Sequence, residues 1–518
     1  MRRAALTMKG FVALAGALAG ASAGCRSAVS DFYDPLGGSG TTTGTTTSTL
    51  PPDCEGDPAT DPSIVRDDCG LFVNTGAATN GDGTKAAPFR RIADAAAKGP
   101  ARIFVCAGDY DEVTTLELEG GTEVFGGFGA CPSSGDWTWS PDARANVLGP
   151  ANLAVVHVSS GAGMAACALH AVNVTAPDAS EPGASSIGII AEDVPLTLAN
   201  VTITTGAGKD GTDGQPSSLD ALPGAPGLAA SATDACVLVP MGGVPGSVTC
   251  DDGITMGGDG GAGGPPPASN GSPGIDGSPM DNTGGLGGTV DVASGQCTAG
   301  GFGHDGAAGE PGQGGSEIGT LTPNGISGGD GTGGKNGALG QGGGGGGGAK
   351  AGTFCKNGVN TVAGPGASGG GGGSGGCGGK GGGGGKAGGS SVGIVSLSSP
   401  LTFTAVSITT AAGGNGGAGA PGKAGGAGGM GGAGGVSSGL AGSKQGCSGG
   451  GGGQGGDGGW GGGGRGGHSV GIAFVGVAPN VDKDVTITAG AAGEGGKSDP
   501  GDAGNGTPGT SAPTLDFN

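Results

Sequence analysis

The sequence predicts an all-β fold, in which short strands stack as coils of a parallel β-helix and long glycine-rich insertions separate the coils. Three observations predict it. A unit of about 20 residues with short β-branched segments recurs along the chain and shows no helical period. Glycine fills every third position over long stretches between these units. Aromatic residues are only 3% of the chain, so we expect a thin apolar core of Val, Ile, Leu and Ala.

The recurring unit is clearest in three copies. "SSIGIIAEDVPLTLANVTITT" at 185–205 aligns without a gap with "SSVGIVSLSSPLTFTAVSITT" at 390–410. "HSVGIAFVGVAPNVDKDVTIT" at 468–488 carries one extra residue before its last segment, and a weaker copy covers 154–175. One copy cannot bury its apolar face alone, whereas stacked copies can. We therefore expect the closing segments "VTIT", "VSIT" and "VTIT" to lie above one another in one sheet.

Glycine spacing organises the insertions. Glycine occupies every third position without a miss through 413–434 and 446–467, and again through 325–346 and 366–384. Three residues is the period of polyproline II, and glycine at each third place lets neighbouring backbones approach. Collagen, a disordered linker and a bundle of polyproline II helices are the three interpretations. The chain leaves one coil and returns to the next through two legs of equal length, which favours the bundle.

Composition and the N-terminus indicate an exported protein. The net charge of −21 repels phosphate backbones, which excludes nucleic acid as a partner. Arg2, Arg3 and Lys9 precede an apolar run from Gly10 to Ala23, as in a signal peptide. The letters "ASA" ending at position 23 fit an ordinary signal peptidase, and "SAGC" ending at Cys25 resembles a bacterial lipobox with Ser at its first position. We expect Cys25 to be lipidated, with a secreted protein as the alternative.

Eleven further cysteines fit an oxidising compartment. Proximity along the chain suggests the pairs Cys54–Cys69, Cys106–Cys131 and Cys236–Cys250, then Cys297–Cys355 and Cys377–Cys447, and leaves Cys167 as a buried free thiol. The sequence contains no CxxC, and no histidine accompanies a cysteine pair. We therefore expect neither a metal site nor a cofactor.

The segment from about residue 68 resembles the N-terminal module of right-handed parallel β-helix proteins, the pectate-lyase-like superfold. The matching residues are Gly83, Thr84, Pro88, Phe89, Ile92 and Ala95. The resemblance covers about 68–205 and the two later coils. It implies a right-handed β-helix whose first coil is capped by a short helix beginning at Pro88. Strands are expected in "RIFVCAG" and "TEVFGGFGAC", with Trp137 and Trp139 in a following loop.

The expected organisation has eight parts. They are a signal peptide (1–24), a Thr/Ser/Pro/Gly tether (25–66), the N-terminal β-helix module with the first coils (67–205), a glycine-rich insertion (206–389), a coil (390–411), a glycine-rich hairpin insertion (412–467), a coil (468–489) and a glycine-rich C-terminal tail (490–518).

Residues able to carry catalysis are sparse, and no catalytic site is predicted. Acidic residues of the early strands are expected to form a solvated face: Asp109, Asp111, Glu112, Glu117 and Glu119. The four histidines lack partners in the sequence and are expected to be structural: His157, His170, His304 and His468. "GKDGTDG" at 208–214 lacks the tandem repetition of calcium-binding β-rolls. Trp460 and Arg465 either mark a contact surface or fill a gap between tracts.

The signal with Cys25, the tether, the β-helix module and the Gly-Gly-X insertions together resemble the glycine-rich PGRS-family lipoproteins of myxobacteria. The tracts also resemble those of mycobacterial PE-PGRS proteins, whose helical N-terminal domain is absent here. The resemblance implies a surface protein of the outer membrane, anchored through Cys25. We expect a structural or adhesive protein without catalytic activity, whose partners are the membrane and extracellular glycans or cell-surface proteins. The alternatives are a carbohydrate-binding or polysaccharide-active β-helix protein, and a protein that binds ice or crystal surfaces.

Overall fold

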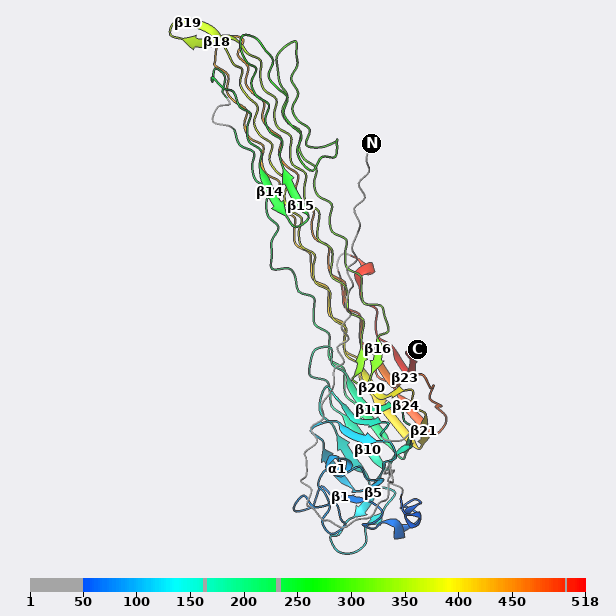
Figure 1. Ribbon diagram of the computed structural model, residues 1–518. Helices are drawn as coiled ribbons and strands as arrows, with labels where there is room; N and C mark the ends of the chain where they lie inside the picture. Colours follow the sequence, from blue (N-terminus) through cyan, green and yellow to red (C-terminus); the bar gives the residue numbers. More distant parts are fainter. Residues whose placement is uncertain (1–49, 162–164, 230–233, 499–500) are drawn as a thin grey trace, which may run out of the picture. The chain divides into compact units, whose positions relative to one another are not determined.

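Three sheets of mostly parallel strands form one part of the molecule, and glycine-rich tracts form the other (Figure 1). The computed structural model describes residues 50–161, 165–229, 234–498 and 501–518. The signal peptide, Cys25 and most of the tether lie outside the described residues. Strands predominate over helices throughout the described chain, as expected of an all-β protein.

Between β2 and β23, the chain contributes strands to the three sheets in turn. The first sheet contains β1 (Leu71–Val73), β2 (Arg102–Cys106), β5 (Glu123–Ala130), β9 (Cys167–His170), β12 (Leu196–Ala199) and β21 (Leu401–Thr404) in this order, with β6 (Thr138–Trp139) antiparallel beside β5. The second contains β3 (Gly108–Asp111), β7 (Ala145–Leu148), β10 (Val172–Ala176), β13 (Thr202–Thr205), β22 (Val406–Thr410) and β24 (Val485–Thr488). The third contains β4 (Leu116–Glu119), β8 (Ala154–Ser159), β11 (Ser186–Glu192), β20 (Ser391–Leu397), β23 (Ser469–Val475) and β25 (Ser511–Asp516).

The register of these strands confirms the repeat alignment. In the third sheet Ile187 of β11 pairs with Val392 of β20, which pairs with Val470 of β23. In the second sheet the closing segments form neighbouring strands β13, β22 and β24, and Val406 pairs with Val485. The insertions between the copies therefore leave the pairing of the coils intact.

The core between the sheets consists mainly of Val, Ile and Leu, as the composition requires. Alternate residues of β10 and β12 are buried, because one face of each strand points inward. β11, β20 and β23 are buried on both faces, since a hairpin covers their outer side. This hairpin, β16 (Thr320–Thr322) and β17 (Gly325–Ser327), places Leu321 and Ile326 on the third sheet.

The expected helix of the N-terminal module is shorter than predicted. α1 comprises only Ile92–Ala96, although Phe89, Ile92 and Ala95 are buried as the spacing indicated. The helix does not begin at Pro88, because Phe89 continues as extended chain and forms a parallel bridge with Val73. Trp139 also differs from expectation, since it lies in β6 rather than in a loop.

The end of the tether and the C-terminal tail are both packed against the sheets. Cys54, Ile64 and Val65 are buried, and two short 3-10 helices, η1 (Pro52–Cys54) and η2 (Pro62–Ile64), shape this segment. The tail contains η3 (Asp502–Gly504) and ends in β25, which extends the third sheet. Apolar side chains within these segments bind them to the fold.

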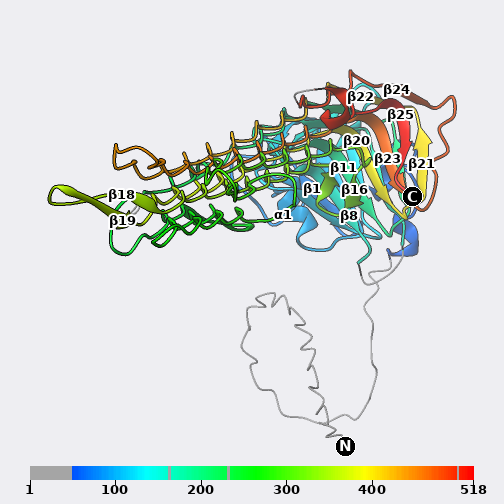
Figure 2. The same ribbon diagram turned by 90° about the horizontal axis from the view of Figure 1, so that it is seen from above.

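The glycine-rich tracts run side by side as a bundle, here called the glycine bundle (residues 206–229, 234–319, 328–389, 411–467, 489–498 and 501–510; Figures 1 and 2). Backbone N–H groups at every third residue donate to a neighbouring tract, as from Gly446, Gly449 and Gly452 to the 412–435 tract. Three residues is the period of polyproline II. Two antiparallel hairpins interrupt the bundle: β14 (Ser247–Cys250) with β15 (Gly253–Met256), and β18 (Gly352–Asn357) with β19 (Asn360–Gly364).

The tract 366–389 is the centre of the glycine bundle. Its residues donate in three directions in turn: Gly370 to the carbonyl of Cys447 (2.9 Å), Gly372 to Gly258 (2.8 Å) and Ser374 to Ala225 (2.9 Å). Because neighbours surround this tract, all three phases of its period need glycine or another small residue over much of its length. A Cβ added at most of its glycines would overlap a backbone carbonyl of the adjacent tract.

Aspartate and asparagine side chains bond N–H groups on the outside of the bundle. The carboxylates of Asp210, Asp213 and Asp305 accept from the backbone N–H groups of Asn415 (2.6 Å), Ala418 (2.7 Å) and Gln454 (2.7 Å) respectively. Such groups would otherwise depend on water. Asp210 and Asp213 belong to "GKDGTDG", so that motif serves the bundle.

Five disulfides are present among the described residues. Cys54–Cys69 and Cys106–Cys131 are the two local pairs expected, and Cys167 is a buried free cysteine. The other three predicted pairings are wrong. The bonds are Cys236–Cys355, Cys250–Cys377 and Cys297–Cys447. Tracts far apart in the sequence lie next to one another in the bundle, so proximity along the chain does not select the partner.

We predict that Gly376→Ala strongly destabilises the protein. The new Cβ would overlap the carbonyl of Gly426, and overpacking of this kind costs about 1–3 kcal/mol. Gly333→Ala is the matched control, because its Cβ would have only the carbonyl of Gly382 nearby, at 3.4 Å. Denaturant unfolding of both variants measures the difference. Equal stabilities would contradict close backbone contact in the central tract.

Candidate functional site

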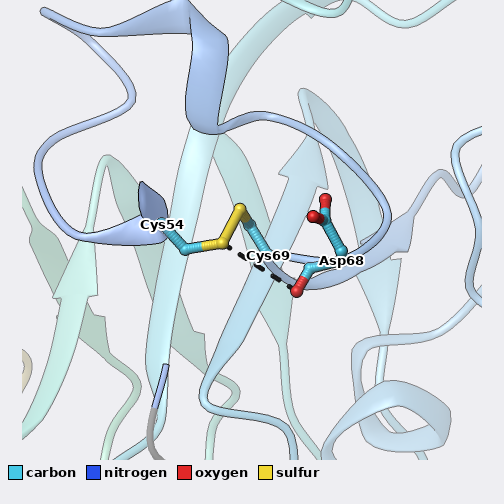
Figure 3. A group of neighbouring side chains, drawn as sticks. All are labelled: Cys54, Asp68 and Cys69. Atoms are coloured by element: carbon cyan, nitrogen blue, oxygen red, sulfur yellow. Dashed lines mark hydrogen bonds between the residues drawn. A yellow bond between two sulfur atoms is a disulfide. The ribbon is translucent and has the colours of Figure 1, made fainter. Parts of the chain in front are cut away.

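The only group of potential metal ligands gathered within the described residues is Cys54, Asp68 and Cys69. Figure 3 shows that the two sulfur atoms are joined in a disulfide. A cysteine ligates a metal as the thiolate, and a disulfide has none. The group is therefore a structural cross-link.

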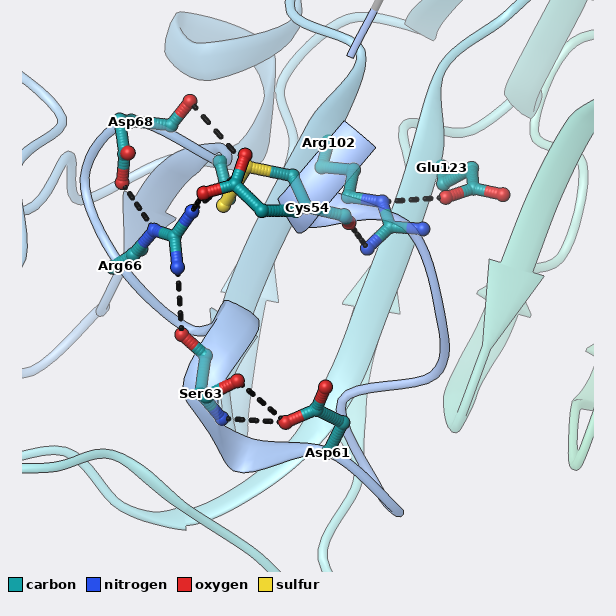
Figure 4. The surroundings of a disulfide bond; sticks show 9 residues. Cys54, Asp61, Ser63, Arg66, Asp68, Arg102 and Glu123 are labelled. Carbon is teal, nitrogen blue, oxygen red and sulfur yellow. Dashed lines mark hydrogen bonds and ion pairs between the residues drawn. A yellow bond between two sulfur atoms is a disulfide. The ribbon is translucent and has the colours of Figure 1, made fainter. Parts of the chain in front are cut away.

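Two arginines hold this disulfide segment in place (Figure 4). Arg102 is nearly buried, pairs with Glu123 at 2.7 Å and donates to the carbonyl of Cys54 at 2.5 Å. Arg66 pairs with Asp53 and Asp68 at the surface. The contacts of Arg102 bind the end of the tether to β2 and β5, and none of these contacts suggests chemistry.

His157 lies between two glutamates on the outer face of the third sheet, which the sequence analysis did not expect. Its Nδ1 atom is 2.8 Å from a carboxylate oxygen of Glu117, and its Nε2 atom is 3.3 Å from one of Glu192. The residues come from β4, β8 and β11, three consecutive strands of the sheet. Both ring nitrogens thus face a carboxylate, one from β4 and one from β11.

His157 and Glu117 line a groove of about 340 Å³, and Glu192 contacts the histidine from beside it. The turn of the β16–β17 hairpin forms one wall with Pro323 and Asn324, and Ile187 and Ile190 give an apolar floor. Thr115, Asn152 and Ser185 add polar atoms. The arrangement combines an acid–base pair with hydrogen-bonding groups and an apolar surface. The repeat alignment contains the relevant signal, since it places β11 next to the weaker copy that carries His157.

Glu112 is buried, although it was expected on a solvated acidic face. Its carboxylate is fully buried and accepts from Arg91 Nη2 (2.9 Å) and from the backbone N–H groups of Ile92 (3.1 Å) and Ala93 (3.4 Å). It thus bonds the first N–H groups of α1 from a distant strand end. Asp109, Asp111 and Glu119 are exposed, and Asp109 accepts from Asn146.

The other histidines and the two bulky bundle residues have structural surroundings. His170 stacks on Phe125 with ring centres 4.4 Å apart, and burial lowers its pKa. His304 lies on the bundle, where it contacts Thr283. Arg465 donates to the carbonyl of Ser316 and to Thr507, so it joins separate tracts. Trp460 is half-buried.

Cys167 and His468 are both buried. The Cys167 thiol donates to the carbonyl of Thr122 at 2.9 Å, and burial raises its pKa to about 12. His468 sits where the last coil begins: its Nε2 atom is 2.9 Å from the carbonyl of Ile318, and its Nδ1 atom accepts from the N–H of Thr510. These bonds assign the proton of the neutral ring to Nε2.

No family model matches the chain, and no curated protein matches it. Among solved structures, a pectin methylesterase from Aspergillus niger is similar over 27% of this chain and 44% of its own length, with 20% identity and a TM-score of 0.18. A likeness this slight says nothing about activity. Within the described residues, no helix has both the length and the apolar character needed to cross a membrane.

We predict that Glu112→Gln destabilises the protein by about 1–3 kcal/mol. The substitution removes the buried carboxylate that pairs with the Arg91 guanidinium. Glu119→Gln, at an exposed position in β4, should change stability by less than about 0.5 kcal/mol. Thermal unfolding of the two variants tests this. If Glu112→Gln were as neutral as Glu119→Gln, the carboxylate would have no role in holding α1.

We also predict that stability falls as the pH drops below the ordinary histidine pKa of about 6.5. Burial lowers the pKa of His468, and protonation of Nδ1 would break its bond from Thr510. The unfolded chain therefore binds a proton at a higher pH than the folded chain does, which favours unfolding in acid. Denaturant midpoints between pH 7.5 and 5 should fall less steeply for His468→Gln. Identical slopes would exclude this histidine as a contributor.

Proposed function

We propose that this chain is an exported, surface-displayed structural or adhesive protein without catalytic activity. A lipid on Cys25 would hold it in the outer membrane at the cell surface. The sheets then correspond to a right-handed parallel β-helix, and the tracts to polyproline II helices that it supports. One observation carries the proposal: the glycine tracts are cross-linked to one another along their length.

The cross-links favour a stiff element over a flexible brush. Backbone hydrogen bonds recur at every third residue, and three disulfides join tracts that are distant in the sequence. Ordering glycine costs more backbone entropy than ordering any other residue. Lateral bonds and covalent staples of this kind offset that cost. A protein that only needed a spacer would not require them.

Exposed aliphatic side chains around one of the staples provide a contact surface. Leu238 and Val239 follow Cys236 closely, and Val359 stands fully exposed in the hairpin that contains Cys355. Val436 lies beside them, since its carbonyl accepts from Ala235. A cluster of exposed apolar residues at a rigid position is typical of a binding surface. Extracellular glycans or proteins of another cell surface are the partners we propose.

The groove at His157 supports a second candidate function. It brings together a histidine, two carboxylates and polar side chains over an apolar floor. Such a set can bind the hydroxyl groups of a polysaccharide and transfer a proton. Release of sugar fragments from soluble polysaccharides, lost in His157→Ala but retained in His170→Ala, would favour this function over the first.

We predict that the oxidised mature protein resists trypsin within the tracts. Lys380, Lys386, Lys423 and Arg465 lie in hydrogen-bonded tracts, so cutting there should require prior reduction of the disulfides. Lys356 is exposed in β18 close to the hairpin turn, and Lys444 is exposed just after the turn at 441–442, so both serve as internal positive controls. Mass mapping of fragments identifies each site.

A double Cys250→Ser, Cys377→Ser variant tests a single staple. It should become cleavable at the nearby Lys380 before the other tract sites. Rapid cutting of the oxidised wild type at all these sites would contradict a stiff element and leave only the sheets as the seat of function.

A further inference from the structure

One tract of the glycine bundle departs from the three-residue period at a single place. In the 206–228 tract, Gly214 donates to the carbonyl of Ala418, and Gly224 donates to that of Ala427. From 214 to 224 the chain advances ten residues, whereas its neighbour advances nine from 418 to 427. The tract therefore holds one extra residue in this interval.

The central tract confirms the extra residue from another side. Cys377 donates to Leu222 and Gly383 to Gln215, so seven residues of the outer tract face six of the central tract. The surplus is taken up within "PSSLDAL", where Ser217 accepts from the N–H of Leu219 in a tight turn. Between Gln215 and Leu222 no backbone hydrogen bond joins the described residues of this tract to a neighbour, and we call residues 216–221 the lifted segment.

A cavity of about 280 Å³ lies beside the lifted segment. Leu219 and Leu222 give it an apolar wall, and the Cys250–Cys377 disulfide lines it from the β14 end. Thr249 and Asn336 contribute polar atoms. The disulfide fixes β14 to the central tract beside the lifted segment, so the walls are held in place before any ligand enters.

The charges at the cavity are nearly balanced. Lys423 pairs with Asp220 at 2.9 Å, and Lys380 pairs with Asp251. Asp252 accepts from the backbone N–H of Leu339 at 2.9 Å. Three carboxylates and the Lys380 ammonium group therefore line the cavity beside an apolar wall, and with Lys423 next to Asp220 the net charge is −1.

We propose that this cavity binds one neutral sugar unit of an extracellular glycan; the proposal rests on the adhesive function above and names its ligand class. A sugar ring offers an apolar face to the leucines and hydroxyl groups that both accept from ammonium and donate to carboxylate. An anion would meet three carboxylates. An ammonium compound would leave the Lys380 donor unused. A site fixed by a disulfide loses little entropy on binding.

Saturation-transfer NMR on the oxidised mature protein tests the proposal, with the methyl glycosides of glucose, galactose, mannose and N-acetylglucosamine as probes. At least one glycoside should receive saturation. Lys380→Met, which keeps the apolar stem and removes the ammonium group, should weaken its binding about tenfold or more. Lys335→Met is the matched control, since Lys335 pairs with Glu310 on the bundle surface and does not line the cavity.

Deletion of Ser218 gives an independent test. It removes the extra residue, so the tract should return to the three-residue register and close the cavity. Binding should disappear while resistance to trypsin is retained, which separates loss of the site from loss of the bundle.

Several results would overturn the sugar site. One is that no glycoside receives saturation from protein whose tracts resist trypsin. Another is that glycoside binding is unchanged in Lys380→Met or in the Ser218 deletion. A third is that choline receives more saturation than any glycoside and loses it in Asp252→Asn. None of these results would contradict the stiff bundle of the proposed function. Rapid tryptic cutting of the oxidised tracts would overturn both proposals, because the cavity walls are those tracts.

Discussion

Close approach of glycine backbones is the constraint on which the rest of this structure depends. Each tract of the bundle donates N–H groups at every third residue to a neighbour, and at most of the tract glycines the space beside the neighbour admits no Cβ. The bundle is thus ordered with little apolar burial, in place of the hydrophobic core that stabilises most folds. Its stability comes from the number of lateral hydrogen bonds and from three long-range disulfides, which offset the high entropy cost of ordering glycine.

The same constraint accounts for the unusual composition and charge. Inside the bundle, backbone groups pair with one another and side chains are excluded, so glycine dominates. On the outside, carboxylates such as those of Asp210 and Asp305 accept from backbone N–H groups of the next tract. Part of the negative charge is therefore structural. Lys386 and Lys423 at the bundle surface pair with Asp330 and Asp220 respectively.

The sheets determine where the bundle begins. The tract that leaves β22 and the tract that returns to β23 are neighbours where they join the sheets, because the N–H of Gly467 donates to the carbonyl of Gly414. The β16–β17 hairpin packs on the outer face of β11 and β20, and its turn also lines the groove at His157. The groove thus exists only where the two parts of the molecule meet, which explains why neither part alone suggests it.

Features that are periodic or local along the chain could be predicted from the sequence alone. The aligned copies gave the strand register, the glycine phase gave the paired tracts, and short separations gave Cys54–Cys69 and Cys106–Cys131. Only the tertiary structure decided which distant tracts are neighbours, and hence the three long-range disulfides, the partners of His157 and the burial of Glu112. The physical reason is that the three-residue period determines which residues of a tract face a neighbour, but not which tract that neighbour is. Each tract can bond neighbours in three directions, and the packing of the whole bundle selects among them.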